Sequence, residues 1–329
     1  MRAAALIALL IAILGAAGCS KAARPHAAAL PGAANRAFKV ALLLPRSINS
    51  DAWTRSGYKG LQLIQRELGA SVAYKENVSD ADFERAYQDF AAEGYDFVIG
   101  HGAQFVSAAE KAAAAFPRTS FAVVGPYAGN NVNLGGISMR EGEMGYLFGA
   151  IAAIKTRTKR IAYLGGAENP SGREITAAFA RGARSIDPAV RVLIDWVGDF
   201  SDAAKARGIA RDQIEGGVDV ILVLAGAAGE GVHAQAQAAG IFTLAWIEDQ
   251  SRLAPRAVLT SNVQDVPALL LRGAALASQG RWEGKQYRFG LAEGVQGLAP
   301  FHGLLSREEE RRVLAIERDL LAGKIDAAG

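Results

Sequence analysis

The sequence predicts an α/β fold of two Rossmann-like lobes with parallel sheets, joined by crossing hinge segments. From Phe38 onward, short apolar runs alternate with helical patterns, as they do in βαβ units. The strand, polar loop and helix of residues 38–68 are echoed at residues 160–185, which indicates two similar lobes. No sharp linker separates the two halves, so we expect the chain to cross between the lobes more than once.

The expected strands are short, and helices fill most of the gaps between them. We expect strands at residues 40–44, 71–74, 97–100, 120–124, 133–138, 160–164, 190–196, 218–224, 243–246, 257–260 and 287–290. We expect helices at residues 54–68, 80–93, 104–115, 142–156, 172–185, 202–215, 228–239, 264–279 and 306–323.

Length and charge limit the classes of function. The chain has 329 residues, enough for roughly two domains of ~150 residues each. Half of the residues are hydrophobic, so both domains can bury a core. The 36 basic and 33 acidic residues are interspersed and give a net charge of +3. Because the charges nearly balance, the sequence shows no basic patch of the kind that binds nucleic acid, and we expect no nucleic-acid partner.

Cysteine and histidine usage gives no sign of a metal site. The one cysteine, Cys19, excludes an internal disulfide and a thiolate zinc site. The four histidines lie far apart, without the i, i+4 spacing of a helical metal-binding pair. We therefore expect neither a metal nor a cofactor.

The amino-terminal segment is typical of an exported protein. Arg2 precedes an apolar run of signal-peptide length that ends in small residues directly before Cys19, much like a bacterial lipobox. We expect residues 1–19 to be a signal peptide and Cys19 to be lipidated, which would attach the protein to a membrane without a spanning helix. The alternative is an ordinary secretory signal with a leftover cysteine. Residues 20–36, rich in Ala, Pro and Gly, are typical of a flexible tether.

The first strand leads into the loop on which the functional interpretation depends. Pro45 ends the apolar run because proline has no N–H for the strand ladder. A polar loop with Asn49, Asp51 and Trp53 follows, and a helix begins there. Ligands of open α/β sheets bind at the carboxyl ends of strands, which is where this loop lies. We interpret Trp53 as a stacking face for a planar ligand.

Later loops at strand ends offer similar groups. His101 and Gln104 follow the strand at 97–100, and Phe200, Gly226 and Asp249 follow three strands of the second half. Rings and short polar groups at one edge suit a planar, hydroxyl-bearing ligand. Each residue also has a plainer explanation, because aspartates cap helices, glycines permit sharp turns and aromatic residues fill cores. Both readings stay open at this point.

Patterns of catalytic residues are weak. The sequence has no G-x-x-x-x-G-K-[ST] phosphate loop and no G-x-S-x-G nucleophile elbow. Glu248 and Asp249 are adjacent, so on a strand they would point to opposite faces and make a poor acid–base pair. We expect no enzyme activity.

Several stretches together resemble the basic membrane protein family, the nucleoside-binding lipoproteins of bacterial ABC importers. The resemblance runs from Lys39 to about Pro300. The stretches that carry it are INSDAWTRSGYKG (48–60), EGEMGYLFGAIAA (141–153), RIAYLGG (160–166), VGDFSDAAKA (197–206), DVILVLAGAAGEGV (219–232), DQ (249–250) and FGLAEGVQGLAP (289–300).

The resemblance implies a type I periplasmic-binding-protein fold with the ligand between the lobes. Two aromatic rings sandwich the purine in such relatives, and Trp53 and Phe200 stand at the matching positions. Asn49 and Asp249 match polar family positions. We expect the first lobe to comprise residues 37–139 and 250–283, and the second lobe residues 140–249 and 284–325.

Two departures bear on the ligand. The family often has Gly-Val-Asp before its Asp-Gln pair, where this chain has Ala245, Trp246 and Ile247. A common aspartate after the strand at 120–124 is replaced by Gly125. Both losses weaken the case for an intact nucleoside and favour a free purine base or another small ring compound.

The expected function is a solute-binding lipoprotein of an ABC importer that binds a purine nucleoside or nucleobase. Its expected ligand-binding residues are Asn49, Asp51, Trp53, His101, Gln104, Phe200, Gly226 and Asp249. Its expected partners are permease subunits and, through the lipid, a membrane at the periplasmic side or the cell surface. The alternatives are a ligand-sensing partner of a membrane receptor and a nucleoside-processing enzyme.

Overall fold

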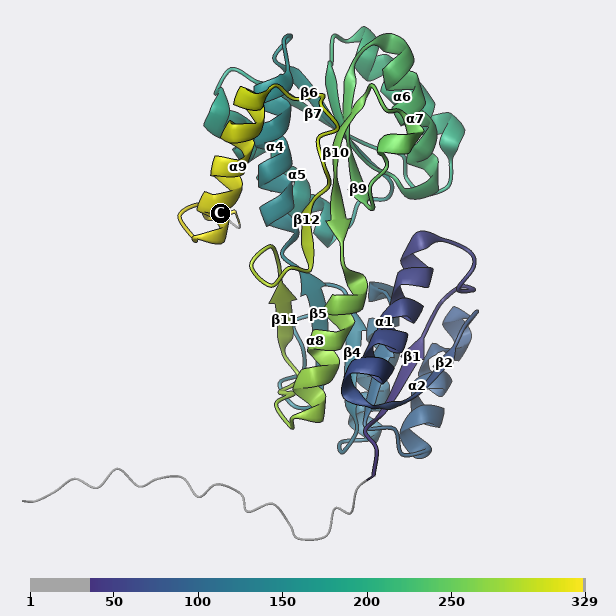
Figure 1. Ribbon diagram of the computed structural model, residues 1–329. Coiled ribbons are helices and arrows are strands. Elements are labelled where there is room, and N and C mark those ends of the chain that lie inside the picture. Colours follow the sequence, from purple (N-terminus) through teal and green to yellow (C-terminus); the bar gives the residue numbers. More distant parts are fainter. Residues whose placement is uncertain (1–35, 328–329) are drawn as a thin grey trace, which may run out of the picture. The chain divides into compact units, whose positions relative to one another are not determined.

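The computed structural model describes residues 36–327, which form two α/β lobes built on two six-stranded sheets (Figure 1). The expected α/β fold class is confirmed. The expected signal peptide, Cys19 and the tether up to residue 35 lie outside the described residues. None of the helices within residues 36–327 combines the length and the apolar character needed to cross a bilayer.

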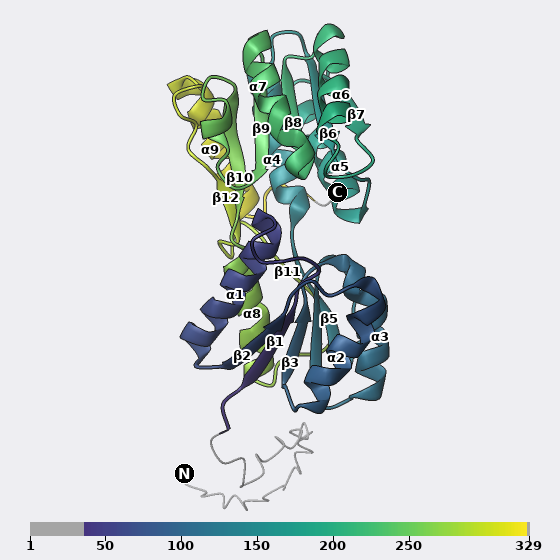
Figure 2. The ribbon, with the colours of Figure 1, turned by 90° about the vertical axis from the view of Figure 1, so that its right-hand side faces the viewer.

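The sheet of the first lobe has the strand order β11-β5-β4-β3-β1-β2 and is parallel throughout. Buried apolar side chains cover both of its faces, with α1 and α8 on one face and α2 and α3 on the other (Figure 2). Its strands are β1 (Lys39–Leu43), β2 (Ser71–Lys75), β3 (Phe97–Gly100), β4 (Ser120–Val124), β5 (Leu134–Met139) and β11 (Gln286–Phe289). Its helices are α1 (Ala52–Leu68), α2 (Phe83–Ala92), α3 (Val106–Ala115) and α8 (Val266–Ser278), with single 3₁₀ turns at Asp80–Asp82 and Ala103–Phe105.

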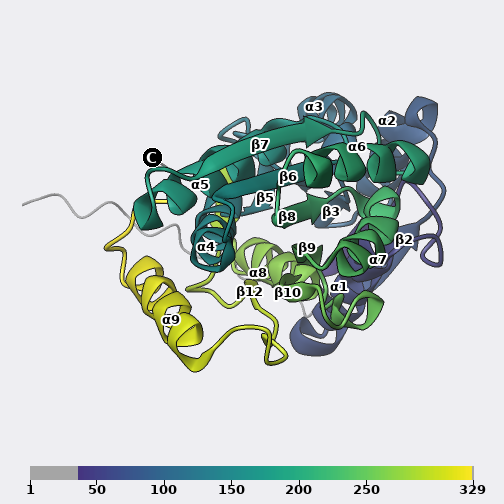
Figure 3. The same cartoon turned by 90° about the horizontal axis from the view of Figure 1, so that it is seen from above.

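The sheet of the second lobe has the order β12-β10-β9-β8-β6-β7, and only β12 runs antiparallel to its neighbour. Helices α4, α5 and α9 cover one face, and α6 and α7 cover the other (Figure 3). Its strands are β6 (Arg160–Gly165), β7 (Arg191–Trp196), β8 (Val220–Leu224), β9 (Phe242–Ile247), β10 (Val258–Gln264) and β12 (Gln296–Leu298). Its helices are α4 (Glu141–Lys155), α5 (Pro170–Ile186), α6 (Ala203–Glu215), α7 (Glu230–Ala239) and α9 (Arg307–Leu321), with 3₁₀ turns at Gly226–Gly229 and Ser251–Leu253.

The chain passes between the lobes three times, from β5 to α4, from β10 to α8 and from β11 to β12. Two of these crossings lie later than the expected boundaries at residues 250 and 284. Strand β10 pairs with β9, so residues up to Gln264 belong to the second lobe. Strand β11 pairs with β5, so Gln286–Phe289 belongs to the first lobe. The physical reason is that a short strand joins whichever sheet edge satisfies its backbone groups.

Small residues let α4 and α5 pack closely against each other. A Cβ on Gly145 would stand 2.7 Å from the carbonyl oxygen of Ile175, which is closer than real contacts allow. Gly149 and Gly182 face the partner helix backbone in the same way. This close pair covers the second sheet next to the first crossing, and it therefore holds the hinge to the core of the second lobe.

Candidate functional site

The site expected from the sequence is distributed over loops at the carboxyl edges of both sheets. The first crossing leaves the carboxyl end of β5, and the second leaves the carboxyl end of β10. The carboxyl edges of the two sheets therefore both adjoin the crossings (Figure 2). This placement agrees with the general rule for ligand binding to open α/β sheets.

Asp51 caps helix α1. Its Oδ1 accepts a hydrogen bond from the backbone N–H of Thr54 at 2.8 Å, and its Oδ2 accepts one from the Ser50 hydroxyl at 2.8 Å. Arg46 lies 2.9 Å away. Partial burial works against ionisation, but these hydrogen bonds and the Arg46 charge outweigh it and hold the pKa of Asp51 below its usual value. The carboxylate thus fixes the start of the helix that carries Trp53, while the neighbouring Asn49 is exposed.

Trp53 lies in the first turn of α1 and is partly buried against the core of the first lobe. One face of its indole is covered by the imidazole of His101, with ring centroids 4.3 Å apart and an angle of 16° between the planes. His101 itself is fully buried, so in this structure it contacts Trp53 and offers no surface to a ligand. Gln104, three residues further along, is exposed in the 3₁₀ turn Ala103–Phe105.

Phe200 lies on the second lobe, in the loop after β7, and 43% of its surface is exposed. Its ring rests against Gly166 and Gly226, which follow β6 and β8 at the same edge of the sheet. A Cβ on Gly166 would collide with the ring, and Gly226 has a φ of +58°, which a glycine adopts without cost. The expected glycine turn is thus present, and it makes room for an exposed aromatic ring.

Two aspartates give the Phe200 loop its shape. Asp199 accepts hydrogen bonds from the backbone N–H groups of Ser201 at 2.6 Å and Asp202 at 2.8 Å. Asp202 caps α6, because its carboxylate accepts a hydrogen bond from the Lys205 N–H. The Phe200 carbonyl also accepts a hydrogen bond from Ala228, 3.1 Å away, which ties the loop to the turn after β8. Hydrogen bonds to its backbone therefore hold the loop, while the Phe200 ring remains partly exposed to solvent.

Asp249 lies in the loop after β9, and its carboxylate already has partners. It accepts a hydrogen bond from the Ser251 N–H at 2.9 Å and lies 3.1 Å from Nε2 of His302. Partial burial opposes ionisation, but these contacts outweigh it and hold the pKa of Asp249 below its usual value. His302 was not expected from the sequence, because it lies 53 residues later, in the segment between β12 and α9.

Two further residues at this edge escaped the sequence analysis. Ile247, the last residue of β9, has a φ of +81°, a strained value for a β-branched side chain and one that often marks a functional loop. Asn262 on β10 is completely buried, and neither amide atom has a hydrogen-bond partner. Only coordinates could reveal either feature, since the sequence shows an ordinary isoleucine and an ordinary polar residue.

The crossings are tied to one another by side chains. Arg140 at the first crossing makes a bidentate pair with Glu293 at the third, with distances of 2.7 and 3.1 Å. Gln264 at the second crossing donates to Glu141 at 3.2 Å. Burial and the nearby Glu174 carboxylate raise the pKa of Glu141 to about 7. The hinge is therefore a hydrogen-bonded unit that includes a carboxyl group which titrates near neutral pH.

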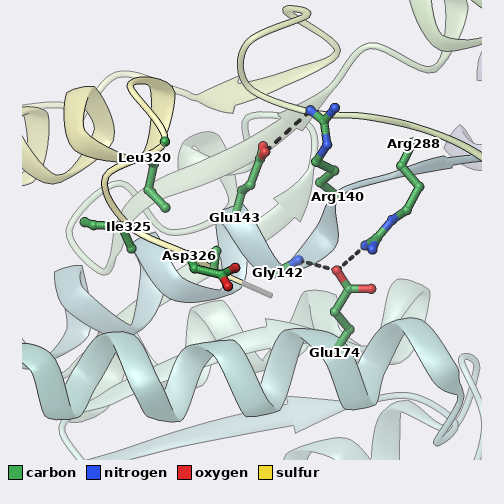
Figure 4. A pocket seen from close by; sticks show the side chains of 10 residues that line it. Arg140, Gly142, Glu143, Glu174, Arg288, Leu320, Ile325 and Asp326 are labelled. Atoms are coloured by element: carbon green, nitrogen blue, oxygen red, sulfur yellow. Dashed lines mark hydrogen bonds and ion pairs between the residues drawn. The ribbon is translucent and has the colours of Figure 1, made fainter. Parts of the chain in front are cut away.

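A pocket of about 300 Å³ lies beside the first crossing (Figure 4). Arg288 pairs with Glu174 there, and Arg140 lies 3.6 Å from Glu143. The two arginines are thus already neutralised within the pocket. None of the expected ligand-binding residues lines it, so this pocket is separate from the expected site.

No group of three or more His, Cys, Asp or Glu side chains within residues 36–327 is arranged to hold a metal ion. The carboxyl edges of the two sheets carry the Trp53 indole, which is covered on one face by His101, the exposed Phe200 ring and a few polar side chains. Such groups can hold a flat ring by its faces and edges.

Comparison with known proteins decides the family. The family described as "ABC transporter substrate-binding protein PnrA-like" (Bmp) matches residues 37–325. The chain belongs to the Bmp family. Members are substrate-binding proteins of ABC transporters, which implies a small-molecule ligand and permease partners and places them outside the enzymes. The expected family is thereby confirmed.

Similar curated proteins carry different names. The chain is 26% identical to the transcriptional activator protein med of Bacillus subtilis, over 84% of this chain and 86% of that protein. It is 29% identical to the ABC transporter nucleoside-binding protein BmpA of Lactococcus lactis, over 68% of this chain and 64% of that protein. It is 27% identical to basic membrane protein A of Borreliella burgdorferi, over 87% and 85%.

Solved structures of similar fold are ABC solute-binding proteins and related regulators. A solute-binding protein of an ABC transporter system from Aeropyrum pernix matches this Bmp protein with a TM-score of 0.73 at 19% identity, covering 88% of this chain and 92% of that chain. A transcriptional activator of the comK gene from Bacillus halodurans matches with a TM-score of 0.74 at 22% identity, over 87% and 99%. At these identities the likeness concerns the fold, which is the expected periplasmic-binding-protein fold.

Proposed function

We propose that this Bmp protein captures a purine nucleoside or nucleobase between its two lobes and delivers it to an ABC permease. The observation that carries the proposal is the pair of aromatic rings at the two carboxyl edges. Trp53 is backed on one face by His101, and Phe200 is exposed above two glycines. A flat heterocycle stacked on both rings gains roughly 1–3 kcal/mol from each.

Polar groups around the two rings supply contacts to the edges of the ligand. Asn49 and Gln104 are exposed on the first lobe, and Asp249 with His302 stands on the second. Asp51 contributes by capping the helix of Trp53, and Gly226 contributes by making room for Phe200. The ligand contacts both lobes only when they close on it, so binding shifts the population toward the closed form.

A free base fits the second lobe better than an intact nucleoside. Ile247 and Trp246 stand where the family often has a short Gly-Val-Asp segment, so a carboxylate that could bind ribose hydroxyls is missing. Asp249 is already engaged with Ser251 and His302. The relative named as a nucleoside-binding protein supports a nucleoside-type ligand, and its name specifies neither purine nor pyrimidine.

Calorimetry on the purified protein tests the proposal. The panel consists of adenine, guanine, hypoxanthine, adenosine, guanosine and inosine, with uridine and myo-inositol as non-purine controls. We expect saturable binding of at least one purine, with bases tighter than nucleosides. Absence of heat and of thermal stabilisation with every purine would refute the proposal. Mass spectrometry of any small molecule that copurifies identifies a ligand outside the panel.

Attachment through Cys19 completes the proposed transport role. A Cys19→Ser variant in the native host is expected to appear in the soluble fraction, while the wild-type protein stays with membranes. Equal partition of both proteins would contradict lipidation.

Ligand sensing is the second candidate function. Two similar proteins are named as transcriptional activators, and such a role needs no permease. Crosslinking in the native host separates the two roles, because transport predicts recovery of permease subunits and sensing predicts recovery of a receptor or regulator.

A further inference from the structure

His101 has a position that neither a ligand contact nor ordinary core packing explains. It follows β3 directly, and its backbone N–H donates to the Leu43 carbonyl of β1 at 2.9 Å. The imidazole is fully buried. The backbone of His101 is thus held by two central strands, and the full burial of the side chain restricts rotation of its ring.

Two interactions link this imidazole to Trp53. Its Nε2 lies 2.9 Å from the Trp53 carbonyl oxygen, and its ring stacks on the indole with 4.3 Å between centroids. Because a carbonyl oxygen only accepts, Nε2 carries the proton. Nδ1 is buried without a partner. Both the backbone and the ring of Trp53 are thus held by one side chain.

The neighbouring sequence leaves room for this arrangement. Gly57 lies one turn after Trp53 on α1, and a Cβ at that position would stand 2.8 Å from the His101 ring. An alanine there would push the imidazole off the indole. The absence of a side chain at Gly57 therefore allows His101 to stack on Trp53.

The protonation state of His101 suits a stacking role. Burial lowers its pKa to about 4, against the opposing effects of the Trp53 carbonyl and the negative charge of Asp51, which is itself paired with Arg46. The ring is neutral at physiological pH. A neutral imidazole supports the indole without adding a buried charge beneath it.

We propose that His101 is a positioning residue that fixes the Trp53 indole from behind and leaves its other face for the ligand. The inference rests on the proposed function for the identity of the ligand, although the fixation of Trp53 can be measured without one. His101 acts through Trp53 and does not touch the bound ring. Its effect on affinity should therefore disappear when Trp53 is removed.

A double-mutant cycle tests this dependence, with adenine and adenosine as probes in calorimetry. We expect His101→Ala to weaken binding at least fivefold and His101→Phe, which keeps a flat ring, to recover most of the loss. We expect Trp53→Ala/His101→Ala to match Trp53→Ala within twofold. Losses that multiply in the double variant would overturn the inference, as would wild-type affinity in His101→Ala.

A measurement without ligand separates the two proposals. The acrylamide quenching of Trp53, obtained as the difference between wild-type and Trp53→Phe proteins, should rise about twofold in a His101→Ala background. If the wild-type protein binds no purine, the proposed function fails and this quenching alone decides the positioning role. Unchanged quenching then overturns it, and increased quenching supports it.

His233 provides the matched control. Within residues 36–327 it is the other fully buried histidine, its Nδ1 lies 2.9 Å from the Thr243 hydroxyl, and burial likewise lowers its pKa to about 4. It lies on α7 of the second lobe. His233→Ala should lower the thermal stability and leave Trp53 quenching unchanged. Equal quenching changes in both variants would show a general loosening and would overturn the positioning role.

Discussion

Trp53 and Phe200 are held in position by opposite means. In the first lobe, Trp53 is held by an added ring, because His101 covers one face of the indole. In the second lobe, Phe200 is placed by missing side chains, because Gly166 and Gly226 leave space beneath it. The first arrangement gives a rigid, half-covered surface, and the second gives an exposed ring on a braced loop. We therefore expect the Trp53 indole to keep its orientation when a ligand binds and the Phe200 ring to adjust to the ligand.

The largest expected effect comes from removing either ring. Trp53→Ala and Phe200→Ala should each cost roughly 1–3 kcal/mol of binding free energy, or about 5- to 150-fold in Kd. The fixed ring should matter more, because less conformational entropy is lost when a ligand meets a surface that is already ordered. Calorimetry with the tightest purine measures both. Equal affinity in Trp53→Ala and wild type would remove the stacking role of the first lobe.

The next effect tests the space beneath Phe200. Gly166→Ala should displace the exposed ring and weaken binding about tenfold with little change in thermal stability, because Phe200 can swing into solvent. Gly226→Ala should weaken binding and also cost about 1 kcal/mol of stability, since its φ is +58°.

Gly240→Ala is the matched control for Gly226→Ala. Its φ is +69° and nothing lies within 4 Å of the added Cβ, so it carries the same backbone cost without touching Phe200. It should lower stability and leave Kd unchanged. An equal loss of affinity in both variants would mean that backbone strain, and not the ring, governs binding.

Two groups with displaced pKa values, His101 and Glu141, make a smaller, pH-dependent difference to stability. His101 has a pKa of about 4 against an ordinary 6.5, so unfolding takes up a proton and stability falls as pH falls from 6.5 to 4. Glu141 has the opposite sign, because its pKa of about 7 against 4.5 makes the native state hold the extra proton, and stability rises as pH falls from 7 to 4.5. Urea unfolding across pH 5–6 measures the slope.

The His101→Phe variant should take up about one proton fewer on unfolding at pH 5.5 than the wild type, and Glu141→Gln about one more. A proton count of one is a slope of about 1.4 kcal/mol per pH unit. His233→Ala should resemble His101→Phe in this experiment, although the two differ in their effect on Trp53. Identical pH slopes in wild type and His101→Phe would contradict a buried neutral imidazole.

The smallest effect concerns the hinge. Glu293→Gln removes a partly exposed pair with Arg140 and should cost about 1 kcal/mol of stability or less. The exposed pair of Lys111 and Glu84, away from the hinge, serves as the control, and Glu84→Gln should leave the thermal stability essentially unchanged because solvent screens this pair. Thermal unfolding compares them. A hinge variant no different from the control would show that the pair between the crossings adds nothing to stability.

The helices and strands were largely predictable, because each expected apolar run and helical pattern has its counterpart in the structure. The failures have local causes. The expected strand at 257–260 continues through the polar Ser261 and Asn262, since both are buried against β9 and β12. Strand β12 was missed because three residues with one glycine carry no periodic signal.

The sequence placed the two rings of the candidate site at the ends of strands but did not reveal the partners of its polar groups, and the ligand-binding role of these residues stays a prediction. Phe200 follows a strand in the sequence, and its side chain is exposed in the structure, as expected for an aromatic residue in a loop. The cap that Asp51 provides was among the plainer explanations open at the sequence level, whereas nothing in the sequence reveals that His101 stacks on an indole 48 residues earlier. Short polar residues at strand ends can serve a ligand or the backbone, and only the distances distinguish the two uses.

The order of segments along the chain also has a consequence for synthesis. Helix α8, which covers Leu61 and Ile64 of α1, and strand β11, the edge of the first sheet, are both encoded after most of the second lobe and before its β12 and α9. A nascent polypeptide that has left the ribosome as far as residue 260 therefore carries an unfinished first sheet and a bare apolar stripe on α1. Such exposed surface is what chaperones bind, so the amino-terminal lobe should finish folding only after most of the second lobe has been made, although its own synthesis begins first.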